Sequence, residues 1–440
     1  MKKRIFALLL MAGLLTGCGR IAAPDETEPA KPPVVTAPAE EQIAYDWMAG
    51  QSPVQNRRIG IDRGGFMNGT VQAVGDSGTY FIYNPGWILD VTPPSPWILY
   101  MDHGSDTVIK LCGRPDCPHN TTDCNAFVDG AQYIHFYNGY LYIIAAGATM
   151  TEDGKEIYWN SKLIRMDPDG TNRVELFDFT AFVREQGADF AQCYFAEDYC
   201  CFDAFTWETD PDTPDTTNWE ATYLYRLDGS MEEPQQDLTP GVVPLYNCGD
   251  ILLAQEYKGE KSTYCDLDLS TGNKTYLMDY PGTPAYCTAE AGYYFLDGKL
   301  HRFTYATGQD EILLETQLTG DYDLLCFPDC FVLADGEFNN ENPDLNLYIY
   351  NWDYELVDTV KIDYPCDVFS VSKLIMSENP RQIILSNGEI MPNAMPMYYI
   401  DKAELGTGNA QIHKYKQPDL EYYQYQQQEE QEDQQWFDEN

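Results

Sequence analysis

Apolar and polar residues alternate in short runs along most of the chain, and these runs recur in a fixed order. A typical unit starts with an apolar run and a turn, continues with a second run rich in Tyr and a longer loop, and closes at an Asp-Gly or Thr-Gly turn. Alternation with a period of two predicts strands with one buried face, and these turns predict hairpins. Seven units cover residues 79–111, 135–170, 191–229, 251–272, 292–308, 324–350 and, less regularly, 368–415.

The repetition itself predicts the architecture. A single hairpin cannot bury its apolar face alone, whereas small sheets stacked in a ring can. We therefore expect an all-β fold, a single β-propeller over residues 45–416 with about seven blades of about four strands each. Six or eight blades are alternatives. Two β-sandwich domains are less favoured, because no Pro/Ser/Gly-rich linker divides residues 71–415.

The first residues follow a different pattern. Basic residues at positions 2–4 precede an apolar run over residues 5–15, which is shorter than the about 20 residues of a membrane-spanning helix and has the layout of a secretory signal. The run ends in Leu-Thr-Gly-Cys18, which resembles the bacterial lipobox. We predict a lipoprotein signal peptide at residues 1–17, acyl chains such as palmitate on Cys18, and an extracytoplasmic protein anchored to the cell membrane. An ordinary signal peptide with a Cys there by chance is the alternative.

Two segments lack any core pattern. Residues 18–44 are rich in Pro, Ala and Glu and are predicted to be a disordered tether between lipid and domain. Residues 417–440 are acidic and rich in Gln and are predicted to be a disordered tail, with partner binding as an alternative role.

Charge narrows the range of partners. The chain has 27 basic and 70 acidic residues, a net charge of −43. This argues against nucleic acid, whose binding requires Lys and Arg to neutralise phosphates, and against direct contact with anionic lipids or wall polymers. Cations such as Ca²⁺ and basic partners are compatible with the charge, and so is a role in solubility alone.

The densest chemical signal is a Cys-x4-Cys-x-His-x4-Cys pattern formed by Cys112, Cys117, His119 and Cys124. Three thiolates and an imidazole suit a tetrahedral structural Zn²⁺. The alternative is a small disulfide loop with His119 as a bystander. Removing Cys18 from the 13 cysteines leaves 12, an even number, which favours the disulfide reading. Both readings stay open here, and in either the loop joins the first blade to the second.

A separate disulfide is predicted between Cys326 and Cys330. They flank Phe-Pro-Asp, which we interpret as a three-residue hairpin connection that places the two cysteines opposite each other.

The matches of this sequence to known catalytic and Ca²⁺-binding motifs are weak. The Gly-Asp-Ser-Gly segment at residues 75–78 matches a serine-protease motif, but every His follows Ser77, so a β-turn is the better interpretation. Asp167, Asp169 and Asn172 could suggest Ca²⁺, but the EF-hand pattern is incomplete and turn chemistry explains them.

Residues 163–172, Leu-Ile-Arg-Met-Asp-Pro-Asp-Gly-Thr-Asn, resemble the blade-closing turn of TolB-like propellers and of related clostridial surface propellers. The cysteine loop, which continues into Asn125 and Ala126, is similar to a signature of propeller lipoproteins from Gram-positive gut bacteria. The resemblance implies the fold over most of the chain and little about the ligand, because propellers host many functions.

The leading functional hypothesis is a non-catalytic surface propeller that binds a protein or a glycan at the cell envelope. One alternative is a glycan hydrolase or lyase that uses acidic residues in a central funnel. Another is a structural accessory in envelope assembly.

Replacing the lipidated residue tests the predicted anchor. Cys18→Ser removes the thiol that accepts the lipid, so the protein should move from the membrane fraction to the soluble fraction, because acyl chains supply the membrane affinity. Fractionation followed by immunoblotting measures this. Unchanged retention in membranes would show that the anchor lies elsewhere.

Overall fold

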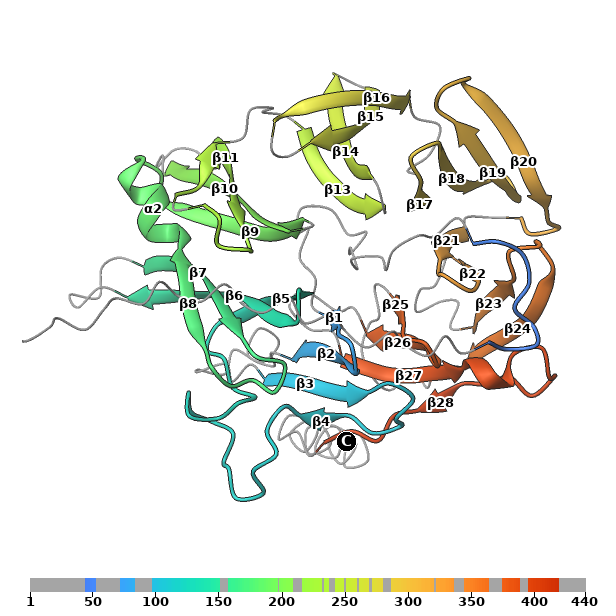
Figure 1. Ribbon diagram of the computed structural model, residues 1–440, viewed down its shortest axis with the longest axis horizontal. Helices are drawn as coiled ribbons and strands as arrows, with labels where there is room; N and C mark the ends of the chain where they lie inside the picture. The colour runs from blue at the N-terminus through green and yellow to red at the C-terminus, as the bar shows by residue number, and fades with distance from the viewer. Residues whose placement is uncertain are drawn as a thin grey trace, which may run out of the picture. The chain divides into compact units, whose positions relative to one another are not determined.

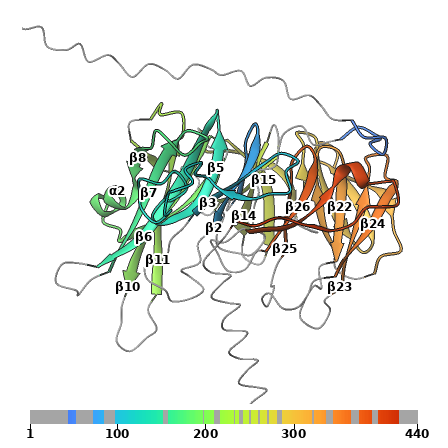
Figure 2. The ribbon, with the colours of Figure 1, turned by 90° about the horizontal axis from the view of Figure 1, so that it is seen from below.

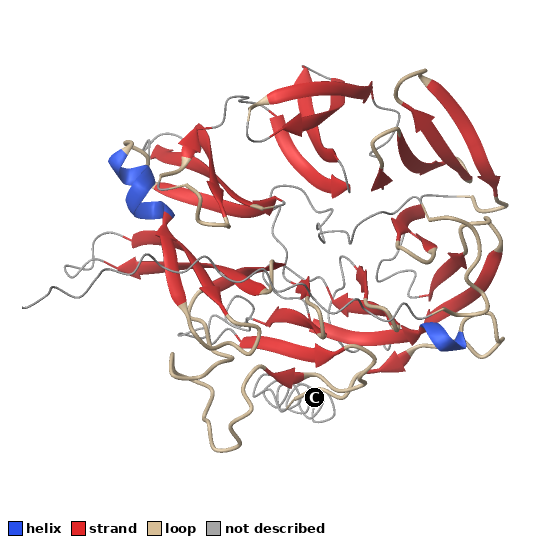
Figure 3. Ribbon diagram, viewed as in Figure 1, coloured by secondary structure: helices blue, strands red, loops and turns tan. Residues whose placement is uncertain are grey.

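The computed structural model describes residues 44–52, 72–83, 97–150, 157–196, 198–208, 216–231, 233–236, 242–248, 251–258, 261–268, 271–279, 286–319, 322–335, 344–363, 374–387 and 395–418. The predicted signal peptide, Cys18 and nearly all of the predicted tether and tail lie outside these residues. Within the described part, strands dominate, with one short helix, α2 (Phe179–Glu185), and a 3-10 turn, η1 (Lys402–Glu404) (Figure 3). Neither of these has the length and apolar character needed to cross a membrane.

Seven four-stranded antiparallel sheets form the blades of a propeller ring, and the strands of each blade are consecutive in the chain (Figure 1). Blade 1 holds β1 (Gln72–Val74), β2 (Gly78–Tyr83), β3 (Trp97–Asp102) and β4 (Ile109–Lys110), and blade 2 holds β5 (Ala131–Tyr137), β6 (Tyr140–Met150), β7 (Ile157–Met166) and β8 (Val174–Asp178). Blade 3 holds β9 (Phe190–Ala196), β10 (Tyr199–Glu208), β11 (Thr216–Arg226) and β12 (Gln235–Gln236), and blade 4 holds β13 (Val242–Cys248), β14 (Ile251–Lys258), β15 (Lys261–Asp268) and β16 (Asn273–Asp279).

The remaining three blades follow the same order. Blade 5 holds β17 (Tyr286–Cys287), β18 (Ala291–Leu296), β19 (Lys299–Thr304) and β20 (Gln309–Glu315), and blade 6 holds β21 (Tyr322–Cys326), β22 (Phe331–Asp335), β23 (Asp344–Tyr350) and β24 (Leu356–Asp363). Blade 7 holds β25 (Leu374–Glu378), β26 (Gln382–Asn387), β27 (Met395–Asp401) and β28 (His413–Lys414). The predicted all-β propeller of seven blades is confirmed.

The Asp-Gly and Thr-Gly turns separate the third strand of a blade from its fourth. Gly170 lies between β7 and β8 and Gly272 between β15 and β16, with φ values of 78° and 69°. This left-handed backbone region favours glycine, which explains why the turns recur with the same chemistry in successive units.

The core lies between the blades, because both faces of the sheets carry apolar side chains. Cys200 and Cys201 are adjacent on β10 and fully buried, and strand geometry sends them to opposite faces. Cys200 packs in a cluster with residues of blade 2, and Cys201 packs in a cluster with Cys265 of blade 4. Both thiols therefore act as small apolar side chains.

The ring closes through the C-terminal segment. Lys416, which follows β28 of blade 7, forms a parallel bridge with Thr107 of blade 1. The Val108 N–H donates to the carbonyl of Lys416 at 2.9 Å, and the Lys416 N–H donates to the carbonyl of Asp106 at 2.7 Å. Among the described strands, no blade combines strands from both ends of the chain, so this contact fastens blade 7 to blade 1.

An N-terminal strap, residues 44–52, lies against blades 6 and 7 (blue in Figure 1, beside β24). The Trp47 Nε1–H donates to the carbonyl of Lys402 at 2.8 Å, and the Trp352 N–H donates to the carbonyl of Ala49 at 2.9 Å. Gly50 has φ +81° and lies so close to the Trp352 backbone that a Cβ would be 2.2 Å from its carbonyl carbon. The strap therefore contacts both blades along the interface between them. Such an interface between neighbouring blades is called a seam below.

A buried ion cluster lies at the same seam. The Lys402 side chain is 1% exposed, and its ammonium donates to Asp329 Oδ2 at 2.7 Å and to a carboxylate oxygen of Glu378. Asp329 belongs to the β21–β22 turn of blade 6, and Lys402 to blade 7. Burial alone would lower the pKa of Lys402, but the charges of Glu378 and Asp329 raise it above its ordinary value. Blades 6 and 7 are thus joined by a charge pair shielded from water.

The expected geometry of Cys326 and Cys330 is wrong. The strand register places Cys326 opposite Phe331, and the Phe327 N–H donates to the carbonyl of Cys330 at 2.8 Å. The hairpin connection therefore has four residues and includes Cys330, which is a buried free thiol. A three-residue connection would have made the two cysteines direct neighbours, but the turn takes up one residue more.

Removing the buried charge at this seam should destabilise the ring. Lys402→Met leaves Asp329 and Glu378 buried without a counter-charge, so the free energy of unfolding should fall by about 3 to 5 kcal/mol. Urea titration monitored by Trp fluorescence measures it. Lys299→Met is the matched control, because its partner Glu315 is 64% exposed and such surface pairs contribute less than about 1 kcal/mol. Equal losses in the two variants would contradict the account of this seam.

Candidate metal centre

The predicted cysteine loop lies between blade 1 and blade 2. Residues 112–127, called the knuckle below, follow β4 and precede β5. Backbone hydrogen bonds form short turns along it: the Cys117 N–H donates to the Arg114 carbonyl at 3.3 Å, and the Cys124 N–H to the Thr121 carbonyl at 2.9 Å. His119 has φ 54°, a conformation uncommon for a residue with a side chain. The tight turns bring residues that are distant in sequence to one place.

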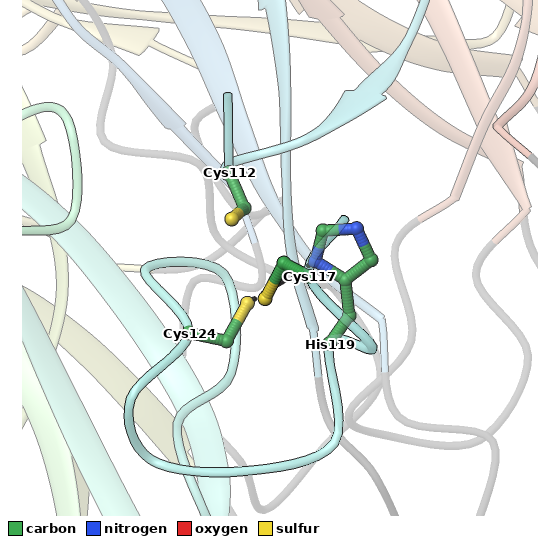
Figure 4. Close-up of side chains that lie close together, drawn as sticks. All are labelled: Cys112, Cys117, His119 and Cys124. Carbon is green, nitrogen blue, oxygen red and sulfur yellow. Dashed lines mark hydrogen bonds between the residues drawn. The ribbon is translucent and has the colours of Figure 1, made fainter. Parts of the chain in front are cut away.

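The knuckle brings all four predicted ligands together. One ligand atom from each of Cys112, Cys117, His119 and Cys124 lies within 4.8 Å of all the others, and Figure 4 shows the four side chains converging. In a tetrahedral site with metal–sulfur bonds of about 2.3 Å, ligand atoms lie about 3.8 Å apart. The cluster therefore fits a metal ion after small side-chain adjustments. The three sulfurs are thiols in this structure.

The surroundings favour the ligating forms of two of the side chains. Burial alone would raise the pKa of the Cys112 thiol, but hydrogen bonds from the backbone and side chain of Arg114 lower it to about 7. Burial, with smaller effects from Lys110 and Arg114, lowers the pKa of His119 and so favours the neutral imidazole. Burial raises the pKa of Cys124 to about 11. Metal binding requires thiolates and a neutral imidazole, so Cys124 is the ligand that must give up a tightly held proton.

Blade 1 holds one side of the knuckle. The Trp97 Nε1–H donates to the carbonyl of His119 at 2.7 Å, and the Ile98 N–H donates to the carbonyl of Ala126 at 2.8 Å. An antiparallel bridge also joins Trp97 to Phe127. The last residues of the knuckle therefore extend the hydrogen bonding of β3.

Blade 2 holds the other side through Arg173, which comes just before β8. Its guanidinium donates to the carbonyls of Phe127 at 2.6 Å, Cys124 at 2.8 Å and Asn125. The Asn125 Nδ2–H also donates to the carbonyl of Asp169 at 3.0 Å. One partly buried cation thus fixes the backbone next to a ligand.

The position of the turn before Arg173 also explains why residue 170 is a glycine. A Cβ on Gly170 would lie 2.5 Å from the carbonyl oxygen of Asn125, so only glycine lets the blade-closing turn approach the knuckle this closely. The Asp167 and Asp169 side chains accept hydrogen bonds from Asn172 and Thr171. This confirms the turn chemistry that the sequence analysis assigned to these acidic residues.

The other candidate motif is also a turn. The Gly75 N–H donates to the carbonyl of Gly78 at 2.9 Å, which closes the hairpin between β1 and β2 around Asp76 and Ser77. Sequence reasoning found the four possible ligands but missed Arg173. The only signal for it was its place directly after the Asp-Pro-Asp-Gly-Thr-Asn turn.

Comparison with known proteins gives no family and only distant structural matches. No family model matches the chain, and no curated protein matches its sequence. Solved structures do match. TolB from Acinetobacter baumannii is 13% identical, with 65% of this chain and 63% of that chain covered and a TM-score of 0.32. This chain thus spans less than two thirds of that TolB.

Two structures of Pyrococcus proteins are also similar. The propeller domain of the trilobed protease from Pyrococcus furiosus is 8% identical, with 79% of this chain and 98% of that chain covered and a TM-score of 0.37. An acylaminoacyl peptidase from Pyrococcus horikoshii is 10% identical, with coverages of 79% and 52% and a TM-score of 0.40. Because these scores are low, the assignment of the fold rests on the sheet order and strand pairing of this chain.

Arg173 should be the main residue that fastens the knuckle to blade 2. Arg173→Ala leaves the carbonyls of Cys124, Asn125 and Phe127 without this donor, and the free energy of unfolding should fall by about 3 kcal/mol. Arg165→Ala is the control from the same blade, since the Arg165 guanidinium lies over the Tyr140 ring at 4.8 Å and such contacts contribute about 1 kcal/mol. Urea titration compares them, and equal stability would refute the role.

Proposed function

We propose that the chain is a lipid-anchored envelope protein whose propeller binds a protein or glycan partner and whose knuckle holds a structural Zn²⁺. The observation that carries the metal site is the convergence of three sulfurs and one imidazole nitrogen within 4.8 Å. The lipobox-like segment ending at Cys18 supports the anchor.

Zinc fits this donor set better than the other common metals. Soft thiolates with an imidazole select Zn²⁺, whereas Mg²⁺ and Ca²⁺ take oxygen ligands. Four protein ligands fill a tetrahedral ion and leave no position for a substrate, so the role is structural. Since blade 1 and blade 2 both hold the knuckle, an ion bound there would stiffen the seam between them.

Charge and architecture support the binding role. A net charge of −43 suits a partner that is basic, neutral or bridged by cations. Blades 2 and 3 carry the longest hairpins, with strands of 10 or 11 residues, which add surface on one side of the ring (Figure 2). Such additions to a repeated scaffold are common places for recognition.

Metal analysis of the full-length protein tests the site. Protein purified anaerobically should contain one zinc per chain, and the Cys112→Ser/Cys117→Ser variant should contain none. Cys193→Ser is the matched control, because Cys193 is a buried thiol of blade 3 outside the knuckle, and it should keep its zinc. A wild-type protein without zinc, or a double variant that retains it, would remove the metal site from the proposal.

The binding role needs a test of its own. Crosslinking in intact cells that carry the full chain should join it to one discrete envelope protein, or the chain should co-sediment with isolated wall glycan. A Cys18→Ser form, released from the membrane, should still bind the same partner when purified. A chain that neither crosslinks nor co-sediments would contradict this part of the proposal.

A further inference from the structure

The knuckle contains the most accessible of the cysteines whose side chains the structure describes. Cys112 and Cys117 are partly exposed. The other cysteines whose side chains the structure describes are buried: Cys124, Cys193, Cys200, Cys201, Cys265, Cys287, Cys326 and Cys330. A small oxidant in the surrounding water would therefore meet the knuckle before any of the thiols in the core.

The same two sulfurs are already neighbours. They belong to a set of ligand atoms within 4.8 Å of one another, and only a short turn, closed by the hydrogen bond from Cys117 N–H to the Arg114 carbonyl, separates them in the chain. A disulfide requires Cβ atoms about 3.5 to 4.5 Å apart, which a turn exposed to solvent can reach by local movement. Cys124 differs, because Arg173 fixes its carbonyl from blade 2.

Two cations lie beside the sulfurs of the knuckle, which also contains Asp116 and Asp123. The Arg114 Nη2 lies 3.5 Å from Cys117 Sγ, and Lys110 lies over the Trp97 ring that contacts His119. The Arg114 guanidinium favours the anionic form of the adjacent sulfur. The exposed side of the knuckle therefore offers electron-rich sulfur to an incoming oxidant.

We propose that the knuckle is a redox switch, in which a peroxide oxidises Cys112 and Cys117 to a disulfide and thereby releases the metal ion. This inference rests on the proposed zinc site. Each interpretation of the Cys-x4-Cys-x-His-x4-Cys pattern then describes one redox state of the loop. The metal site is the reduced form, and the disulfide is the oxidised form.

The chemistry balances with hydrogen peroxide as the two-electron oxidant. One thiolate attacks a peroxide oxygen, the O–O bond breaks, and the products are a sulfenic acid and hydroxide. The second thiolate then attacks the sulfenic sulfur, forming the S–S bond and releasing a second hydroxide. Two sulfurs lose one electron each, and the two peroxide oxygens gain them. Cys124 and His119, left as two ligands, hold a divalent ion too weakly to retain it.

The switch has a structural consequence at the seam of blades 1 and 2. Residues of the knuckle accept hydrogen bonds from Ile98 on β3 and from Arg173 beside β8. Release of the ion removes the metal–ligand bonds that keep the exposed turn of the knuckle close to Ile98 and Arg173. Oxidation should therefore loosen this seam and leave the seam of blades 6 and 7, where Lys402 lies, unchanged.

The test uses the full-length protein, purified anaerobically with its zinc counted first. Hydrogen peroxide is added together with a chromogenic zinc chelator. We expect one zinc released for each two thiols lost, a peptide crosslinked between Cys112 and Cys117 by mass spectrometry, and full zinc uptake after reduction with a dithiol. The Cys193→Ser control should release zinc at the same rate as the wild type.

The outcomes separate this inference from the metal site itself. A reduced protein without zinc overturns the zinc site and the switch together. Zinc that is present and stays bound while the knuckle thiols remain unmodified overturns the switch alone. Zinc release that occurs only together with oxidation of the buried thiols also overturns it, because the protein would then be losing zinc by unfolding.

Discussion

A blade of a propeller has two apolar faces, and neither can be covered from within the blade. Every blade depends on its neighbours for burial, so the stability of the whole ring is decided at the seams between sheets. At most seams, side chains such as Cys200, Cys201 and Cys265 simply fill the space between facing sheets. Some seams also carry polar contacts, such as the hydrogen bond from the Tyr142 hydroxyl of blade 2 to the carbonyl of Leu227 of blade 3. Three such polar fastenings involve parts of the chain that lie outside the blade pattern.

Two of these fastenings lie near the ends of the described chain. Lys416 crosses from blade 7 to blade 1, and the N-terminal strap covers the seam of blades 6 and 7 above Lys402. The third is the knuckle between blades 1 and 2. There the outermost strand of blade 1, β4, has only two residues, and the knuckle adds hydrogen bonds to β3 where a longer outer strand would otherwise lie. A metal ion at this place would stiffen a seam that the short strand leaves weak.

The sequence predicted the blades well, because strand alternation and Asp-Gly turns are local signals. Each predicted unit overlaps one blade, and the four residues of the Cys/His pattern do converge. The expected three-residue connection between Cys326 and Cys330 has four residues in the structure, since spacing alone does not assign the residue at its end, and the disulfide itself stays a prediction. Arg173 could not be predicted, because its partners are backbone carbonyls from another blade and leave no mark in residue types.

The central claim is that the knuckle fastens blade 1 to blade 2 through a bound ion. Hydrogen exchange, measured by mass spectrometry before and after chelation, tests this most directly. The account predicts faster amide exchange after metal removal in peptides that contain Ile98, Phe127 and the turn before Arg173, with unchanged exchange in blade 5. Equal exchange at the knuckle with and without the chelator would contradict it, because the seam would then hold together without any ion.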